Sequence, residues 1–413
     1  MEQVNLTQAA ETKRKTQKSG KHLLLGCAFL LAVILTASIA FAAAWFAAKA
    51  KYSSGNGHLV ESIRQAREII HDNFFYYDEE QEKDLADAAL KAIASATGDL
   101  YAEYYTKEEY DELIKQNQRT FVGVGILTQI NEDGVVQILD VYDDTPASEA
   151  GLLPGDILLE INGVAFDGVM TLSEFLDNVC AEDGASNSFV IGRGEAKLSF
   201  DIIVREVHTP AVSSRMLTDS IGYIHVLSFH GTCVDETKEA MKTLREAGMQ
   251  TLVLDLRDNL GGSLYDAVDI ADIFLPKNYI VTTLRARDGK VVEYKTHDAG
   301  TDIRMALLVN GYSASASELV AGALKDHGAA YLIGTKTYGK GIVQSFYEIP
   351  ETKGWIKITT DAYYTPNGVC VQDEGITPDL NVELSEEAKK YSIDYIPFEL
   401  DTQLQAAIAY LED

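Results

Sequence analysis

One segment carries serines at a position suited to nucleophilic catalysis. Residues 309–328, VNGYSASASELVAGALKDHG, place Ser313, Ser315 and Ser317 between a strand-like run and a helical run. A serine in such a turn lies beside a helix N-terminus, where the next amide can stabilise developing negative charge. Ser317, followed by Glu318, also fits a plain helix cap. The segment is not the G-x-S-x-G nucleophile elbow, because Ser317 stands where the last glycine belongs.

A lysine further along the chain is a candidate general base. The segment 334–341, GTKTYGKG, is close to a phosphate-binding P-loop, but Gly341 replaces the hydroxyl residue that ligates magnesium. The following run, IVQSFYEI, has the pattern of a strand, whereas a phosphate site needs a helix N-terminus there. Burial away from carboxylates lowers the pKa of a lysine, so Lys340 in this glycine-flanked apolar setting can act as a neutral base. Gln344 is placed to hold the amine without restoring its charge.

Two adjacent glycines complete the candidate chemistry. They lie in LDLRDNLGGSLYDAVDIADIF, residues 254–274, where a strand-like run turns into a helical run at Gly261-Gly262. Adjacent glycines expose backbone N–H groups, which suits an oxyanion hole, although a bare helix cap is the simpler interpretation. Among the histidines, His230 at the end of a strand-like run is the alternative base, whereas His327 fits a helix C-terminus.

A small β-rich module precedes these segments. Residues 119–207 alternate short strand-like runs with turns, and the portion ASEAGLLPGDILLEING is specific. The module resembles a PDZ domain over most of its length. The resemblance predicts that Val122, Gly123, Val124 and Gly125 form a loop whose amides receive a peptide's terminal carboxylate, beside a strand edge that pairs with the peptide. The alternative is that these glycines only make a tight turn.

The residues before and after this module form a helical region and an α/β region. Residues 52–118 carry apolar stripes at helical spacing and form a predicted helical arm. From His208 the runs IGYIHV, TLVLDL, MALLVN, AAYLI and GIVQSFYEI alternate with helical stretches. This alternation predicts a largely parallel sheet with crossover helices. The tail from Asp401 has the pattern of a closing amphipathic helix.

The PDZ-like module, LDLRDNLGG, SASASE and TYGKGIVQ, in that order, resemble the carboxy-terminal processing peptidases, the tail-specific serine proteases. The resemblance covers roughly residues 55–413 and implies that Ser315 is the nucleophile, Lys340 the general base and Gln344 the residue that orients it. It implies an oxyanion hole formed by the amide of Ala316 and that of Gly261 or Gly262. The family commonly has Asn-Pro-Gly-Gly or a third glycine where this chain has Asn259-Leu260-Gly261-Gly262.

The resemblance also implies an α/β multidomain fold with a catalytic core like those of crotonase and Clp protease. It implies that the PDZ domain gates the active site, that the terminal helices form a homodimer, and that no cofactor or metal takes part. The sequence patterns and the resemblance together predict a basic cytoplasmic tail (1–21), a transmembrane signal-anchor helix (22–48), the helical region (52–118), the PDZ domain (119–207), the serine protease core (208–385) and a C-terminal helical tail (386–413).

The N-terminal residues predict a location at the cell membrane. The run from Leu23 to Ala48 has no charged residue and is long enough for a helix that crosses the roughly 30 Å apolar core of a bilayer. Five basic residues between Lys13 and Lys21 predict a cytoplasmic N-terminus and an extracytoplasmic catalytic part. The alternative is a cleaved signal peptide ending near Ala40-Phe41-Ala42.

Composition excludes one class of partner. The chain has a net charge of −28, and its first 51 residues carry seven basic and two acidic side chains, so the remainder is still more acidic. A surface of that charge repels nucleic acid. The family resemblance implies protein or peptide substrates with free C-termini, captured by the PDZ domain and cleaved by a Ser-Lys dyad. The alternatives are a silent binding module, a nucleotide-dependent enzyme and a conventional Ser-His hydrolase.

Overall fold

The computed structural model describes residues 58–413 apart from 79, 80, 132 and 299. The chain divides into two compact units, Met1–Asp84 and Leu85–Asp413. In the first unit a helix covers residues 58–73, and its apolar side chains Leu59 and Val60 are exposed. Within the described ranges no helix has the length and apolar character needed to cross a bilayer. The predicted basic tail and anchor, residues 1–48, lie outside the described residues.

The predicted helical arm is interrupted by a strand. Helices α2 (Gln81–Ser95) and α3 (Lys107–Asn117) flank strand β1 (Glu103–Tyr105). Helix α3 begins with a capping box in which Thr106 and Glu109 satisfy each other's backbone amides. Strand β1 pairs antiparallel with the long strand β18 (Gly354–Tyr364), which belongs to the catalytic half of the sequence. This part of the arm is therefore built into the catalytic half.

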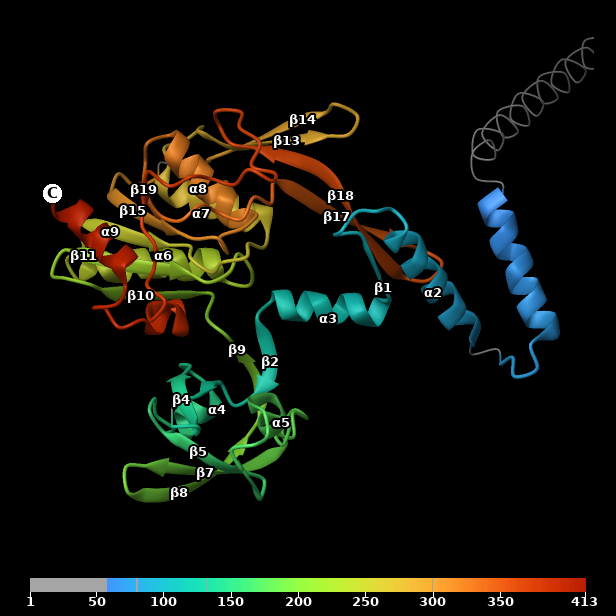
Figure 1. Cartoon of the computed structure of the whole chain (residues 1–413), viewed down its shortest axis with the longest axis horizontal. Coiled ribbons are helices and arrows are strands. Elements are labelled where there is room, and N and C mark those ends of the chain that lie inside the picture. Colours follow the sequence, from blue (N-terminus) through green and yellow to red (C-terminus); the bar gives the residue numbers. More distant parts are fainter. Residues whose placement is uncertain (1–57, 79–80, 132, 299) are drawn as a thin grey trace, which may run out of the picture. The chain divides into compact units, whose positions relative to one another are not determined.

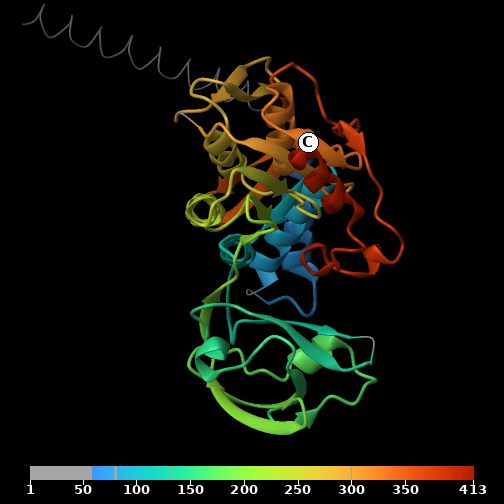
Figure 2. The same ribbon diagram turned by 90° about the vertical axis from the view of Figure 1, so that its left-hand side faces the viewer.

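The PDZ-like module is an antiparallel sheet with two short helices. Its strands, green in Figure 2, are β3 (Ile126–Ile130), β4 (Val136–Val141), β5 (Ile157–Ile161), β6 (Val164–Ala165), β7 (Ser186–Arg193) and β8 (Ala196–Ile203), of which β4, β5, β7 and β8 are labelled in Figure 1. The main sheet has the order β3-β4-β5-β7-β8, so β3 is an edge strand. Helices α4 (Pro146–Ala150) and α5 (Leu172–Leu176) contribute Ala147 and Phe175 to its buried core. Strands β2 (Thr120–Gly123) and β9 (Arg205–His208) pair separately, where the chain enters and leaves the module.

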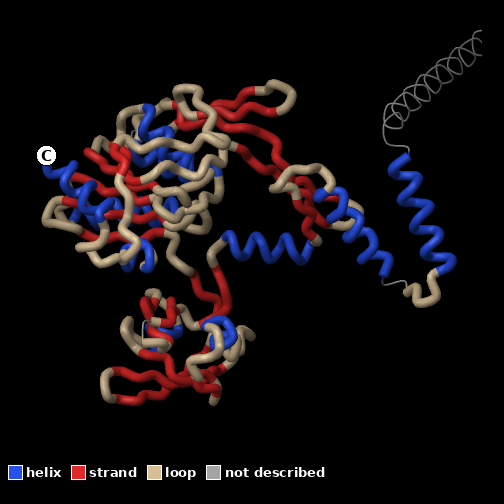
Figure 3. Tube along the Cα trace, in the orientation of Figure 1, coloured by secondary structure: helices blue, strands red, loops and turns tan. Residues whose placement is uncertain are grey.

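The core contains a six-stranded sheet in the order β10-β11-β12-β15-β16-β19. Its strands are β10 (Val212–Met216), β11 (Ile221–Val226), β12 (Thr251–Asp255), β15 (Arg304–Val309), β16 (Tyr331–Gly334) and β19 (Leu380–Asn381). All neighbouring pairs are parallel except β10 with β11. Helices and strands alternate along much of this part of the chain, and Figure 3 shows helices lying beside the strands. The predicted parallel sheet is thus present for the first four runs.

Period-two alternation sends side chains of each central strand to two apolar layers. Leu252 and Leu254 of β12 pack with the helices α6 (Cys233–Glu246), α7 (Leu264–Phe274) and α8 (Ala316–Asp326). Val253 packs on the other face with Leu404, Ala407 and Leu411 of α9 (Thr402–Glu412). The predicted closing helix is therefore confirmed, and it covers one face of the sheet.

The fifth predicted run is not part of the parallel sheet. Strand β17 (Ile342–Ile349) pairs antiparallel with β18 in a second sheet, together with β1, β13 (Ile280–Ala286) and β14 (Val291–Lys295). The run is half-buried along most of its length, as expected for a strand that pairs with a single described neighbour, β18. The prediction failed because alternation of apolar residues identifies a strand but not its partner. The hairpin formed by β17 and β18 is important for the candidate site, because β17 begins two residues after Lys340.

Candidate active site

Ser315 lies at the junction between strand β15 and helix α8. Its φ of 57° and ψ of −113° put a non-glycine residue in a sparsely populated backbone region. Such strain persists only where surrounding contacts enforce it. Here the Ser315 amide donates to the Glu318 carboxylate at 2.9 Å, and Ser317 Oγ donates to the carbonyl oxygen of Asn259 at 2.7 Å. The turn therefore presents Ser315 at the N-terminus of α8 in a fixed backbone conformation.

Glu318 joins this turn to the loop that carries Lys340. Its carboxylate is fully buried and also accepts hydrogen bonds from Thr337 Oγ1 at 2.6 Å, Gly339 N at 2.7 Å and Lys340 N at 2.8 Å. The phenol oxygen of Tyr363 lies 2.9 Å from the Ser315 carbonyl oxygen and 2.8 Å from that of Lys340. These contacts hold the two backbones side by side. Sequence reasoning treated Glu318 only as part of a helix cap, and did not consider Tyr363.

The side chain of Lys340 enters the same cavity as Ser315. Its Nζ lies 4.4 Å from the centre of the Tyr101 ring. Burial lowers the pKa of Lys340, and the nearby charge of Lys357 lowers it further. In the described part of the chain, no hydrogen-bond acceptor or carboxylate lies within bonding distance of Nζ, Ser315 Oγ included. The predicted base is therefore half-buried and free of counter-ions, in a conformation that is not hydrogen-bonded to the serine.

Gln344 shares the cavity but has a different partner from the one predicted. Its side-chain amide donates to Thr359 Oγ1 on β18 at 3.2 Å, across the β17–β18 pair. It makes no hydrogen bond to Lys340 in this structure. The orienting role predicted for Gln344 stays a prediction.

Within the glycine pair, Gly261 faces Ser315 at very close range, whereas Gly262 lies against Phe229 and His230. Gly261 and Gly262 have φ values of 105° and 148°. A Cβ on Gly261 would lie 2.9 Å from Ser315 Cβ and 2.7 Å from the Ala314 carbonyl oxygen, so no larger residue fits there. The Gly261 amide donates to Asn259 Oδ1 at 2.9 Å. The amides of Gly262 and Ala316 have no acceptor among the described residues, so these two are the free N–H donors beside Ser315.

These groups line one cavity of about 920 Å³. Its walls include all six residues predicted for catalysis and the oxyanion hole: Ser315, Ala316, Lys340, Gln344, Gly261 and Gly262. His230, the alternative base, also lines the cavity, and burial together with the charge of Arg119 lowers the pKa of its imidazole. It makes no hydrogen bond to Ser315 in the described structure. Across the described ranges, no group of three or more His, Cys, Asp or Glu side chains is arranged to hold a metal ion.

The predicted peptide-binding loop is shorter than expected. Val122 and Gly123 belong to strand β2, where they pair with Glu206 and Arg205 of β9. The prediction was wrong for these two residues because a Val-Gly alternation also fits a short edge strand. Val124 and Gly125 do form a turn before β3, and both are buried. Their carbonyl oxygens accept hydrogen bonds from the amides of Ala147 and Tyr142 at 2.9 and 3.0 Å, which fixes the turn beside helix α4.

Comparison with known proteins supports the same interpretation. Residues 220–382 match peptidase family S41, and residues 137–191 match the PDZ domain. A carboxy-terminal-processing protease of Bartonella bacilliformis is 36% identical over 305 residues, which cover 71% of this chain and 69% of that protein. A CtpA-like serine protease of Staphylococcus saprophyticus is 31% identical over 348 residues, which cover 84% of this chain and 69% of that protein.

A solved S41 protease structure from Bacteroides fragilis has the same fold, with a TM-score of 0.52 at 18% identity, and the match covers 82% of this chain and 91% of that chain. The predicted family resemblance is confirmed, as are the serine-type chemistry and the PDZ module. The chain belongs to the carboxy-terminal processing peptidases of family S41.

Proposed function

We propose that the chain is a membrane-anchored endopeptidase that captures protein C-termini with its PDZ module and cleaves near them with a dyad of Ser315 and Lys340. One observation carries the proposal. The serine at a strained helix N-terminus and the counter-ion-free lysine line one cavity, and a single buried carboxylate, that of Glu318, fixes both backbones. A structural role alone gives no reason to half-bury a lysine amine without a carboxylate partner.

The chemistry follows from the groups in the cavity. Neutral Lys340 takes the proton of Ser315 Oγ as the oxygen attacks the substrate carbonyl carbon. The amides of Ala316 and Gly262 stabilise the resulting oxyanion, and Gly261 would do so only if Asn259 released its amide. The Lys340 ammonium then gives its proton to the leaving amine. Water, activated by the lysine that is neutral again, hydrolyses the acyl-enzyme and restores the serine.

The cycle requires a movement of the lysine side chain. In this structure Nζ lies over the ring of Tyr101, so it must leave that ring to reach Ser315 Oγ. A general base acts at hydrogen-bonding distance, about 2.6–3.2 Å between heavy atoms. We infer that this structure is the resting conformation and that peptide capture favours the active one.

The capture step uses the open edge of β3. This strand pairs with β4 only, and Leu127 and Ile130 are exposed along it. A substrate C-terminus can add to this edge as a further strand, with its carboxylate at the Val124-Gly125 turn. The apolar run at residues 23–48 would anchor the enzyme with its catalytic part outside the cytoplasm. The homodimer implied by the family resemblance belongs to the same proposal.

The test compares the full-length chain with Ser315→Ala and Lys340→Ala on an unfolded protein with an apolar C-terminus. We expect cleavage by the wild type and none by either variant, with circular dichroism spectra that agree. A lysine variant that still cleaves would transfer the base role to His230. Capture is tested with the same substrate carrying an amidated C-terminus, for which we expect slower processing. Equal rates would refute carboxylate recognition.

A further inference from the structure

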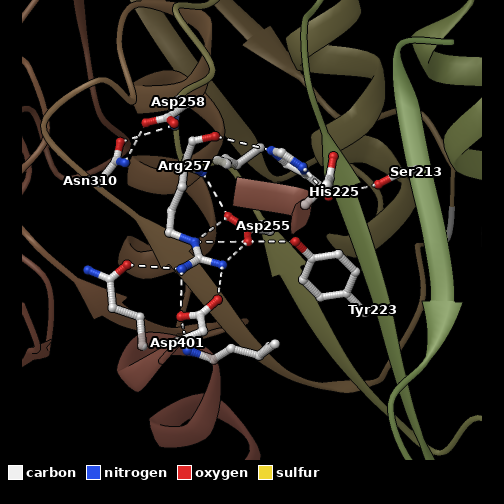
Figure 4. Close-up of polar contacts among 12 residues, drawn as sticks. Ser213, Tyr223, His225, Asp255, Arg257, Asp258, Asn310 and Asp401 are labelled. Carbon is white, nitrogen blue, oxygen red and sulfur yellow. Dashed lines mark hydrogen bonds and ion pairs between the residues drawn. The ribbon is translucent and has the colours of Figure 1, made fainter. Parts of the chain in front are cut away.

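A buried charge network lies directly behind the loop that faces Ser315. Arg257, two residues after the end of β12, is fully buried, and its guanidinium contacts two aspartates at once (Figure 4). It donates to Asp255 Oδ2 at 2.6 and 2.9 Å, and to the two oxygens of Asp401 at 2.9 and 3.0 Å. Gln403 Oε1 accepts a further hydrogen bond at 3.1 Å. Asp401 and Gln403 come from the start of α9, so the last helix described closes this network.

The backbone of Arg257 is held as firmly as its side chain. Its amide donates to Asp255 Oδ1 at 2.8 Å, and its carbonyl oxygen accepts from His225 Nε2 at 3.1 Å. The next residue, Asp258, exchanges hydrogen bonds with Asn310 at 3.1 and 2.7 Å and has a φ of 57°. Figure 4 shows these contacts converging on residues 255–258. The network therefore fixes where the glycine loop leaves the sheet.

From that point the loop reaches the nucleophile through Asn259. This buried residue donates from Nδ2 to the Val226 carbonyl oxygen at 2.6 Å and accepts the Gly261 amide at 2.9 Å. Its own carbonyl oxygen accepts from Ala314 N at 3.0 Å and Ser317 Oγ at 2.7 Å. A displacement of Arg257 is thereby passed to both the glycine amides and the serine turn.

Helix α9 is also attached to the sheet by contacts that do not involve these charges. Its apolar side packs on the sheet through Leu404, Ala407 and Leu411. At the far end of α9, Arg304 donates to the carbonyl oxygen of Tyr410 at 2.6 Å. Buried ion pairs contribute little stability compared with apolar residues of the same volume, whereas they do fix geometry. We therefore expect Asp401, at the start of α9, to fix the position of Arg257 rather than to hold α9 on the sheet.

We propose that Asp401 is a positioning residue for the oxyanion hole, acting through Arg257, so that α9 sets the geometry of the glycine loop. This inference rests on the proposed role of Ser315 and its neighbouring amides. Asp401 touches no reacting atom. Its loss shifts the amides of Gly261 and Gly262 relative to Ser315 and lowers kcat while leaving substrate capture unchanged.

The test uses Asp401→Asn in the full-length chain. Asp401 Oδ1 accepts a hydrogen bond from the Leu404 amide at 2.9 Å, and this bond caps α9. Asparagine has the same size and can still accept this bond, but it lacks the negative charge that pairs with Arg257. Arg304→Gln is the matched control, because it weakens the attachment of the same helix at its other end. We expect Asp401→Asn to lower kcat about 10- to 100-fold, as small misplacements in active sites do, with KM changed less than about twofold. Arg304→Gln should change kcat less than about twofold.

Gln403→Leu gives the same test in a chain that keeps both aspartates, and we expect a smaller fall in kcat. Thermal unfolding midpoints of all three variants report any general loss of stability. The inference is overturned if Asp401→Asn retains wild-type kcat, or if Arg304→Gln loses as much kcat at an equal loss of stability. The Ser315→Ala variant distinguishes a failure of the proposed nucleophile from a failure of the proposed positioning role. An active Ser315→Ala chain overturns the proposed nucleophile, whereas an inactive one beside a fully active Asp401→Asn chain overturns only the positioning role.

Discussion

Replacement of Tyr101 by leucine should move the pH dependence of cleavage to lower pH. The ring face of Tyr101 lies 4.4 Å from Lys340 Nζ, a distance at which an aromatic ring attracts a cation. This attraction stabilises the ammonium and opposes burial, which together with the charge of Lys357 lowers the pKa of Lys340. Leucine keeps the site apolar but removes the attraction, so the lysine becomes neutral at lower pH.

The size of the change follows from the contact. A cation over an aromatic ring gains about 0.5 kcal/mol at an exposed site and about 2 kcal/mol when desolvated. Since about 1.4 kcal/mol corresponds to one pKa unit, the acid limb of the profile should move down by about 0.4 to 1.5 pH units. At pH values below the wild-type acid limb, Tyr101→Leu should therefore be more active than the wild type, because more of its Lys340 is neutral there.

The assay is kcat/KM for a fluorogenic peptide between about pH 6 and pH 10, since kcat/KM reports the ionisation of the free enzyme. Tyr101→Phe is the control, because it keeps the ring and should leave the limb in place. An acid limb that stays fixed in Tyr101→Leu, or moves to higher pH, would refute the reasoning. In that case Lys340 is not the titrating base, or Tyr101 does not contact it in solution.

Three further outcomes follow from the site and its supports. The Glu318 carboxylate accepts hydrogen bonds from four N–H and O–H groups, and Glu318→Gln replaces one of its acceptor oxygens by an NH₂ donor. This variant should lower the free energy of unfolding, measured by urea denaturation, by about 2–3 kcal/mol and should also reduce cleavage. Gly261→Ala forces a Cβ against Ser315 and should lower kcat at least about 100-fold in the peptide assay, while an active variant would place the loop elsewhere. Burial alone would lower the pKa of His225, but Asp394 and Asp255 raise it above 6.5, so the imidazolium contributes stability that is complete below pH 6.5 and is lost as the pH rises through the raised pKa. Urea denaturation of His225→Gln beside wild type should therefore show its largest deficit at low pH, and a deficit that grows with pH would contradict this assignment.

Local patterns identified candidate groups for catalysis, because their signals lie within a few residues. They indicated three serines at a strand-to-helix turn, the glycine pair and the glycine-flanked Lys340, and the family resemblance selected Ser315 among the serines. The structure brings Ser315, the glycine pair and Lys340 into one cavity. The partners that fix them were not predicted. Arg257 and Asp401 are 144 residues apart, and Tyr101 precedes Lys340 by more than half of the described chain. Contacts of that kind depend on the packing of whole elements and leave no periodic trace in the sequence.

The same limit explains the two errors in the fold. The run after Lys340 was correctly predicted as a strand, but β17 pairs with β18 outside the parallel sheet, because strand pairing is decided by tertiary contacts. Val122 and Gly123 fit a loop in the PDZ pattern, yet they pair with β9 at the point where the chain enters and leaves the module. In both cases the local conformation fits two neighbourhoods, and only the assembled chain selects one.

The attachment of the Ser315 and Lys340 backbones to one carboxylate has a consequence for how fast the enzyme can respond. Because Glu318 and Tyr363 fix both backbones, the remaining freedom lies in the torsions of the lysine side chain. Side-chain rotations take picoseconds to nanoseconds, whereas rearrangement of a packed strand takes microseconds or longer. In the proposed mechanism, the delay between the arrival of a peptide and the first cleavage is then set by the movement of the Lys340 side chain away from Tyr101, and the backbone of the serine turn needs no rearrangement.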